Sequence, residues 1–272
     1  MAKNGYESAW LREEDLDAFN LRHHDGVPVE HLPGRARGYV ETMFGQMYPE
    51  AAPKPGDVVA EFGPGVGWIA EAVLDRFSPK EVVGLDISPA IATKAHERLP
   101  DPRARFTVYD GRTLPFPDGT FDVIYSCATI QHIEKHAAFL LMRELHRVLK
   151  PGGHAVLHFM TVHFIPRETI PYEEECLRHV DDLPQHWMHY YSFDELYTWF
   201  HDLIKVSDLD IKSSADRGSF FVHFAGGPGK PFRDPHLPDL TYPARAGAPP
   251  RPRLRTIARS GAVWVKRKAS GR

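Results

Sequence analysis

The chain has 272 residues, 42% of them hydrophobic, and a formal net charge of −3. This length suits one sizeable catalytic domain with extensions, and the small net charge excludes a general attraction to phosphate backbones or anionic membranes. The acidic N-terminus has no apolar core of signal-peptide length, no apolar stretch approaches the ~20 residues that cross a bilayer, and two cysteines make no disulfide framework. We therefore expect a cytoplasmic protein with a small-molecule partner and no membrane association.

Five predicted strands alternate with helical segments between residues 55 and 160. Each strand is a short, mostly apolar run bounded by Gly, Pro, Asp or Ser, and the runs cover residues 58–62, 81–86, 105–109, 121–126 and 154–159. Apolar residues at helical spacing predict helices between most of these strands. Ser88 is the expected cap of the second helix, and Lys150-Pro151-Gly152-Gly153 is expected to end the last one. Alternation at these short intervals predicts a mostly parallel sheet with right-handed crossovers.

The rest of the chain is expected to complete a doubly wound α/β domain. Residues 192–200 predict a helix, and residues 204–211 and 219–225 predict extended segments that can finish the sheet as an antiparallel edge. We therefore expect an N-terminal helical lid or cover at residues 1–50, a core at 51–226 with an insertion at 161–191, and a C-terminal extension at 227–272. That extension is rich in Pro and Gly and ends in basic residues.

The turn after the first predicted strand reads Gly63-Pro64-Gly65-Val66-Gly67. In doubly wound sheets, this strand-to-helix turn is the usual cradle for a nucleotide-like ligand, and glycines let the ligand approach backbone N–H groups. A dinucleotide fingerprint needs its third glycine where Trp68 stands, and no Lys-Ser or Lys-Thr pair follows, so neither NAD nor a P-loop ligand is favoured. Glu61 would repel a diphosphate but would attract a ligand that carries an ammonium and a sulfonium.

Two further acids follow the next two strands. Asp86 ends the second strand, where a carboxylate can accept both hydroxyls of a ribose, and Asp110 follows the third, near the place of an adenine amino group. A lone acid at a strand end is most often a solvated side chain. The placement of Glu61, Asp86 and Asp110 after three successive strands favours one cationic nucleoside ligand.

The order and spacing of these motifs resemble those of class I S-adenosylmethionine-dependent methyltransferases. The resemblance covers roughly residues 55–159 and rests on Glu61-Phe62-Gly63-Pro64-Gly65-Val66-Gly67, Gly84-Leu85-Asp86, Asp110-Gly111, Leu114-Pro115-Phe116, Phe121-Asp122-Val123-Ile124-Tyr125-Ser126 and Leu149-Lys150-Pro151-Gly152-Gly153. It implies S-adenosylmethionine as the cofactor and a seven-stranded sheet with a reversed last strand. Glu61 stands where an aspartate is commonest, which keeps the charge.

The resemblance also implies which residues contact the cofactor. They are Gly63, Gly65, Asp86, Ile87, Asp110, Gly111 and the turn at Ser126, and with Glu61 and Gly67 of the glycine turn they make up the predicted cofactor site. Because a sulfonium is already an excellent leaving group, catalysis of methyl transfer can rest largely on proximity and orientation. A general base is needed only when the acceptor must lose a proton. His132, on the acceptor side in similar proteins, is the candidate base, although a histidine there can equally be structural.

The acceptor is expected to be a small organic molecule methylated at oxygen or nitrogen, with specialised metabolism as one setting. Aromatic and histidine side chains within residues 161–191 can line its pocket or can simply attach the insertion to the core. No metal site is expected, because the histidine spacing matches no established ligand pattern. We assign Cys127 no covalent role.

Two alternatives stay open. An RNA or protein methyltransferase is supported by the basic tail, although Ser126-Cys127-Ala128-Thr129 differs from the Asn/Asp-Pro-Pro-aromatic run of enzymes that methylate base or glutamine amino groups. No RNA-binding module is visible, which argues against nucleic acid. A non-methylating protein that retains the cofactor is the second alternative, because a fold alone does not establish chemistry.

Overall fold

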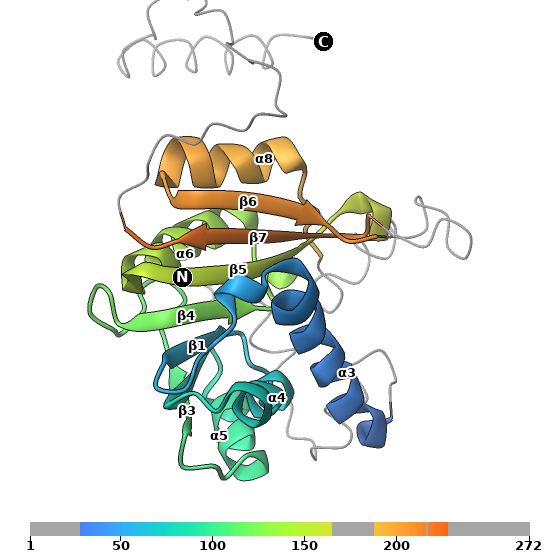
Figure 1. The fold of residues 1–272 in the computed structure, drawn as a ribbon, viewed down its shortest axis with the longest axis vertical. Helices are drawn as coiled ribbons and strands as arrows, with labels where there is room; N and C mark the ends of the chain where they lie inside the picture. The colour runs from blue at the N-terminus through green and yellow to red at the C-terminus, as the bar shows by residue number, and fades with distance from the viewer. Residues whose placement is uncertain (1–27, 165–187, 216, 228–272) are drawn as a thin grey trace, which may run out of the picture. The chain divides into compact units, whose positions relative to one another are not determined.

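Seven strands form one sheet within residues 28–164, 188–215 and 217–227, the part of the chain that the computed structural model describes. The strands are β1 (Val58–Phe62), β2 (Glu81–Asp86), β3 (Ala104–Val108), β4 (Phe121–Ser126), β5 (Leu149–Met160), β6 (Ser207–Ser213) and β7 (Ser219–Ala225). Their order is β3-β2-β1-β4-β5-β7-β6, with β7 antiparallel to both of its neighbours and the other pairs parallel. The predicted fold class, with its reversed last strand, is confirmed (Figure 1).

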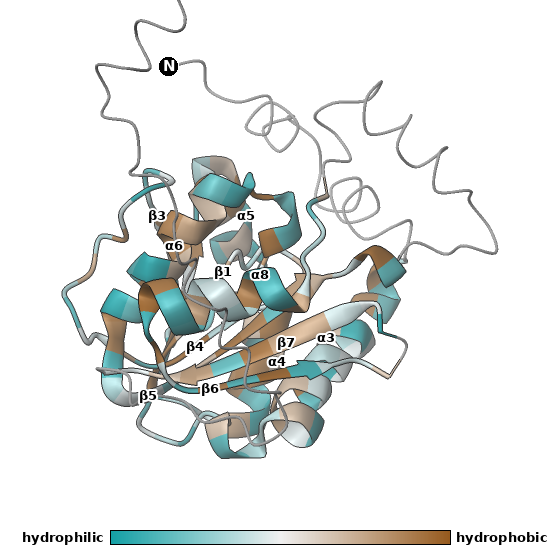
Figure 2. Ribbon diagram, turned by 90° about the horizontal axis from the view of Figure 1, so that it is seen from above, coloured by the Kyte–Doolittle hydropathy of each residue, from teal (hydrophilic) through white to brown (hydrophobic). Residues whose placement is uncertain are grey.

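Helices cover both faces of this sheet (Figure 2). One face carries α3 (Leu32–Val40) with its π-helical continuation Glu41–Met47, α4 (Trp68–Phe77) and α5 (Pro89–Arg98). The other face carries α6 (Lys135–Val148) and α8 (Phe193–Tyr197) with the π-helical segment Thr198–Ile204. Short 3-10 turns lie at Val29–His31, Pro49–Ala51, Ile130–His132 and Val162–Phe164. Among the described helices, none is both long and apolar enough to cross a membrane.

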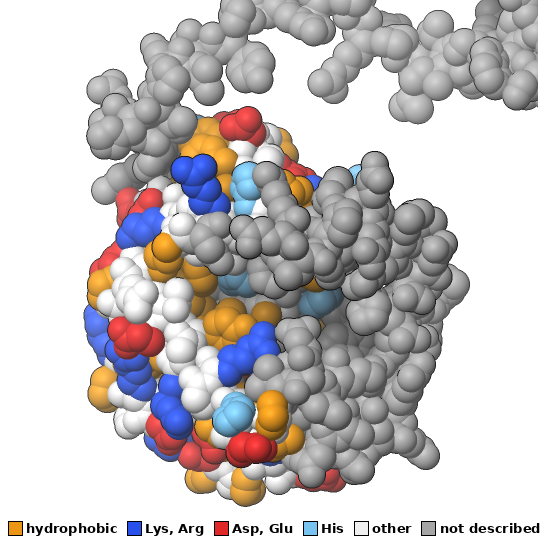
Figure 3. Space-filling model, turned by 90° about the vertical axis from the view of Figure 1, so that its right-hand side faces the viewer, with side chains coloured by type: hydrophobic (Ala, Val, Ile, Leu, Met, Phe, Trp, Pro, Cys, Tyr) orange, Lys and Arg blue, Asp and Glu red, His pale blue; other side chains and the backbone are white. Residues whose placement is uncertain are grey.

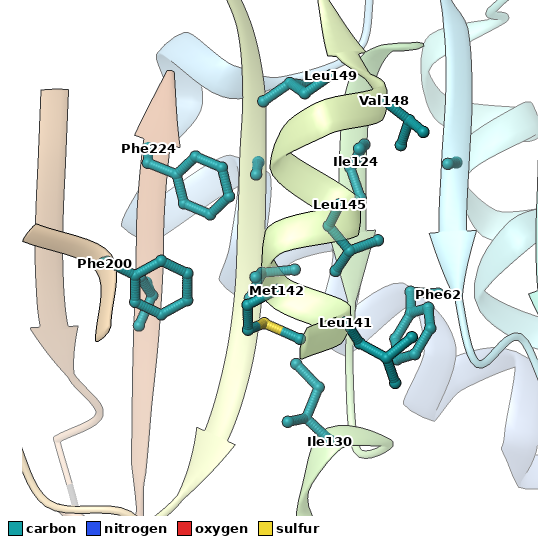
Figure 4. Packing of buried hydrophobic residues seen from close by; sticks show 14 of the residues in the cluster. Phe62, Ile124, Ile130, Leu141, Met142, Leu145, Val148, Leu149, Phe200 and Phe224 are labelled. Atoms are coloured by element: carbon teal, nitrogen blue, oxygen red, sulfur yellow. The ribbon is translucent and has the colours of Figure 1, made fainter. Parts of the chain in front are cut away.

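The face covered by α6 has the larger buried cluster (Figure 4). Leu141, Leu145 and Val148 recur along one side of α6 and are at most 2% exposed, so the helix lies flat on β4 and β5. Phe200 and Phe224 continue the cluster toward β7, with ring centroids 5.3 Å apart. This packing holds the carboxyl ends of the parallel strands at one edge, on the right in Figure 1.

The described part of the N-terminal region packs as a cover. Tyr48 is fully buried, its hydroxyl donates to the Phe221 carbonyl at 2.7 Å, and the Lys212 ammonium lies 4.3 Å from its ring centroid. Phe44 packs edge-on against Tyr125 of β4. Residues 1–27, on which the lid alternative depends, lie outside the described residues, as do residues 165–187, 216 and 228–272.

β5 and β6 differ most from the sequence-based expectation, and β3 begins and ends one residue earlier than expected. β5 begins at Leu149 rather than at His154, because Gly152 and Gly153 pair with Gly226 at the end of β7. There, the Gly152 N–H donates to the Gly226 carbonyl at 2.9 Å, and the Gly226 N–H donates to Gly153. At the other end of the domain, the helix predicted at residues 192–200 continues to Ile204, so the extended segment starts three residues later, at Ser207.

Candidate active site

The glycine turn lies between β1 and α4, at the carboxyl edge of the sheet. Gly63, Gly65 and Gly67 all have left-handed backbone angles, with φ of 71°, 52° and 84°, a conformation that is costly for residues with a Cβ. A Cβ at Gly63 would overlap the Thr129 side chain, whereas around Gly65 no atom of the described residues lies within 4 Å of the Cβ position. The turn is therefore closed by protein at Gly63 and open at Gly65.

Arg98, in the last turn of α5, stabilises the glycine turn through hydrogen bonds to its carbonyls. Its Nε donates to the Val66 carbonyl and its Nη2 to the Gly67 carbonyl, both at 2.6 Å. The third nitrogen pairs with Glu71 at 2.9 Å, and the guanidinium carbon lies 3.9 Å from the Trp68 ring centroid. The Arg98 side chain is only 8% exposed. Sequence reasoning missed this residue, because an arginine near a helix C-terminus ordinarily compensates the helix dipole in solvent.

Glu61 lies at the end of β1 but is enclosed by protein. It is 2% exposed, and the Tyr125 hydroxyl donates to its Oε2 at 3.0 Å. Burial raises the pKa of Glu61 to about 8, against weaker lowering effects from the Tyr125 hydrogen bond and the Arg98 charge. A nearby cation would favour the carboxylate again. The structure therefore sets Glu61 apart from the two other predicted acids, which lie in more open surroundings.

Asp86 and Asp110 lie at the ends of the neighbouring strands β2 and β3. Asp86 Oδ1 accepts the Ser88 N–H at 2.9 Å, and burial raises the pKa of this carboxyl to about 6. Asp110 is exposed, and hydrogen bonds from the N–H groups of Thr113 and Arg112 lower the pKa of its carboxyl. The β2–β3 register pairs Asp86 with Val108.

The loops that carry Ile87 and Gly111 approach each other beside these acids. A Cβ at Gly111, whose φ is 79°, would lie 3.9 Å from Ile87 Cγ2. The structure thus places Asp86, Ile87 and Gly111 side by side at the same edge of the sheet as the glycine turn. Figure 3 looks onto this edge and shows hydrophobic side chains in its middle, with Lys, Arg and His around them.

The turn after β4 closes the site on its other side. The Ser126 hydroxyl is buried and donates to the Phe62 carbonyl at 2.8 Å, so this side chain joins β4 to β1. Thr129 donates to the Gly63 carbonyl at 3.0 Å. Between them, Ala128 is left-handed, with φ of 55°, and its N–H donates to Nδ1 of His158 at 3.2 Å. Sequence reasoning did not identify Thr129 or His158 as part of this site.

His132 follows directly, at the end of the 3-10 turn Ile130–His132. It is half-buried, and its Nε2 lies 3.4 Å from Nε2 of the buried Gln131. The carbonyl of Gln131 accepts the His189 N–H at 2.6 Å, which brings the end of the predicted insertion beside the candidate base. Of the predicted acceptor-side segment, only residues 161–164 and 188–191 are described.

Other chemistry-bearing groups form no second site among the described residues. His154 and His223 stack, with ring centroids 5.3 Å apart, but no cluster of three metal-ligating side chains occurs there. Cys127 is buried, and burial raises the pKa of its thiol well above its usual range. A protonated thiol of this kind is a poor nucleophile.

These features fit an S-adenosyl ligand. The open, left-handed turn at Gly65 is a cradle that a Cβ would fill, and N–H groups of such a turn can meet a ligand's polar groups. The half-buried Asp86 carboxyl ends the next strand, in the position where a ribose is held in related folds.

Comparisons with known proteins agree with this geometry. Residues 60–157 match a methyltransferase domain model. The chain is 40% identical over 100 residues to a 2-methyl-6-phytyl-1,4-hydroquinone methyltransferase of Synechocystis sp., covering 36% of this chain and 30% of that one. It is 36% identical over 119 residues to a trans-aconitate 2-methyltransferase of Variovorax paradoxus, covering 44% of this chain and 42% of that one. The chain thus spans less than half the length of either relative.

Solved structures share the fold. A phosphoethanolamine N-methyltransferase 2 of Haemonchus contortus, solved with S-adenosyl-L-methionine, superposes with a TM-score of 0.59 at 16% identity, covering 82% of this chain and 60% of that one. An S-adenosylmethionine-dependent methyltransferase named SibL gives a TM-score of 0.54 at 16% identity, covering 71% of this chain and 56% of that one. At such identities the likeness concerns the fold alone. With the family model over residues 60–157 and the glycine turn, it agrees with a methyltransferase domain of the class I S-adenosylmethionine-dependent kind.

Proposed function

We propose that this protein transfers the methyl group of S-adenosylmethionine to an oxygen or nitrogen of a small organic molecule, in the cytoplasm. The observation that carries the proposal is the glycine turn, which is open at Gly65 and is stabilised by hydrogen bonds from Thr129 and Arg98. The cofactor supplies a methyl group on a sulfonium, an excellent leaving group. The protein's own task is then to bind and orient the cofactor and the acceptor, and to exclude water from between them.

The small size of the acceptor is inferred from the relatives. Their names refer to a hydroquinone, trans-aconitate and phosphoethanolamine, which are small molecules of different chemistry. The matches to these relatives span only 100 to 119 residues, and the family model ends at residue 157, so the acceptor side of the domain is free to differ. The basic tail after Pro250, on which an RNA or protein acceptor depended, lies outside the described residues.

A direct test combines binding with turnover. Isothermal titration calorimetry of the full chain is expected to show binding of both S-adenosylmethionine and S-adenosylhomocysteine. Release of S-adenosylhomocysteine should then follow addition of one member of a panel of hydroquinones, carboxylic acids and amino alcohols. Absence of binding by either cofactor form would rule out the enzyme, whereas binding without turnover on any panel member would favour the non-methylating alternative.

Asp86→Ala is expected to weaken cofactor binding by roughly 1–3 kcal/mol, the scale of losing hydrogen bonds to a charged group. The carboxyl of Asp86 ends β2 beside the glycine turn and is the proposed partner of the ribose hydroxyls. Calorimetry with S-adenosylhomocysteine measures the change. Asp101→Ala is the matched control, since Asp101 precedes β3 at the opposite edge of the sheet. Equal affinities for the two variants would show that Asp86 is not a ligand of the cofactor.

His132 is proposed as the general base when the acceptor must lose a proton. His132→Ala is then expected to lower kcat by about 10²–10⁴-fold, the usual contribution of a general base, while leaving the affinity for S-adenosylhomocysteine within about threefold, since a difference of that size is under 1 kcal/mol. The exposed His136, four residues along, supplies the control variant His136→Ala. An unchanged kcat in His132→Ala would remove this residue from the mechanism.

A further inference from the structure

We propose that His158 is a positioning residue for the cofactor site, which it shapes by holding the turn after β4 against the glycine turn. The inference rests on the proposed function only in taking the glycine turn as the place where the cofactor binds. His158 lies on β5, is 6% exposed and is not part of any motif that led to the family. Its role follows from the two hydrogen bonds of its ring.

Both ring nitrogens of His158 are occupied. The Ala128 N–H can only donate, so Nδ1, at 3.2 Å, accepts and carries no proton. The proton of the neutral ring is therefore on Nε2, which donates to Ser219 Oγ at 2.8 Å. Burial lowers the pKa of His158 to about 4, which keeps the ring neutral at neutral pH. With both nitrogens engaged and the ring enclosed, His158 is not a base for the acceptor.

The hydrogen bond to Ala128 fixes a backbone conformation that alanine rarely adopts. Ala128 has a φ of 55°, in the left-handed region, so an acceptor for its N–H helps to hold the turn in place. The next residue, Thr129, donates from Oγ1 to the Gly63 carbonyl at 3.0 Å and also lies 3.2 Å from the Cys127 carbonyl. A continuous path of contacts thus runs from His158 to the glycine turn.

Ser219 connects this path to the antiparallel strand. As the first residue of β7, it accepts from His158, and its own hydroxyl proton points to Met160 Sδ at 3.7 Å. Its backbone N–H donates to Ser214 Oγ at 3.0 Å, within the turn that joins β6 and β7. β7 therefore supplies the acceptor for the Nε2 proton that the Ala128 contact requires, and His158 in turn holds the turn on which the cofactor site depends.

The test compares two replacements of the same residue. In His158→Asn, the side-chain amide oxygen can take the place of Nδ1 as acceptor, whereas His158→Leu keeps bulk but accepts nothing. We expect the leucine variant to bind S-adenosylhomocysteine about tenfold more weakly and the asparagine variant to stay within about threefold of the parent, the scale of one hydrogen bond. Circular dichroism confirms that both variants fold. Equal losses in the two variants would reduce His158 to a packing residue and overturn the proposal.

A double-mutant cycle of Thr129→Val with His158→Leu tests the path. Valine keeps the shape of Thr129 but loses the bond to the Gly63 carbonyl, so we expect about a tenfold loss of affinity alone and little further loss when it is combined with His158→Leu. Full additivity of the two changes would contradict a shared path.

Nitrogen-15 NMR of the unsubstituted protein reports the tautomer independently of any ligand. We expect the Nε2–H form of His158, and the Nδ1–H form would overturn the proposal. If the parent protein binds no S-adenosylhomocysteine, the proposed function fails instead. The tautomer of His158 would still be measurable in that case.

Discussion

Gly65→Ala is expected to leave the protein folded and to remove most of its affinity for S-adenosylmethionine. The left-handed backbone of Gly65 costs an alanine roughly 1–2 kcal/mol, and among the described residues nothing lies within 4 Å of the new methyl group, so the stability loss should end there. The same methyl group would stand in the space that the cofactor is proposed to occupy. A clash of about 1–3 kcal/mol lowers affinity by roughly 5- to 150-fold. Calorimetry and thermal unfolding measure the two effects separately.

Gly63→Ala is the matched variant, and its main effect should be a loss of stability rather than a loss of cofactor affinity. Gly63 has a similar backbone, with φ of 71°, but its new Cβ would overlap Thr129. The backbone cost and the overpacking together predict a loss of about 2–5 kcal/mol in the free energy of unfolding. Adding Thr129→Ala should restore part of the stability lost through the overlap, but none of the stability lost through the backbone conformation. If Gly65→Ala unfolds as easily as Gly63→Ala, or binds the cofactor as well as the parent does, the open side of the turn is not the cofactor's place.

The strands that could be predicted from sequence are those whose limits are local. β1, β2, β4 and β7 have the expected ends, because each is an apolar run closed by Gly, Pro, Asp or Ser. The start of β5 could not be predicted, because Gly152 and Gly153 pair with Gly226, more than seventy residues further on. A Pro-Gly-Gly stretch reads locally as a stop, and only its distant partner makes it part of a strand.

The residues of the candidate site also fall into those that local sequence predicts and those that it does not. The glycines and the end of β2 could be predicted, and the end of β3 to within one residue, because strand ends in a parallel sheet must meet at one edge. That Glu61 lies beside the ligand stays a prediction, and its hydrogen bond from the Tyr125 hydroxyl could not be read from the sequence. Arg98, Thr129 and His158 act through single hydrogen bonds to backbone groups of other loops. Such partners depend on tertiary packing and leave no periodic signal in the sequence.

Arg98→Ala is expected to lower the free energy of unfolding by about 1–3 kcal/mol, the scale of leaving buried hydrogen-bonding groups without their partner. The substitution leaves the carbonyls of Val66 and Gly67 without their donor and Glu71 without its cation. Because those carbonyls belong to the glycine turn, binding of S-adenosylhomocysteine should weaken as well. Arg98→Lys keeps the charge but not the planar fork that reaches two carbonyls at once. Its stability should therefore lie between those of the parent and the alanine variant. Denaturant unfolding and calorimetry test both effects.

The exposed Arg105 provides the control for the effect of Arg98→Ala. Arg105 on β3 also pairs with a glutamate, Glu81, at 2.8 Å, but its side chain is 49% exposed. Arg105→Ala should therefore change stability by less than about 1 kcal/mol and leave cofactor affinity unaltered. Equal losses in the two alanine variants would mean that the contacts of Arg98 contribute no more than those of a surface ion pair. A large loss at Arg98 alone would identify this arginine as the support that holds two carbonyls of the glycine turn in place.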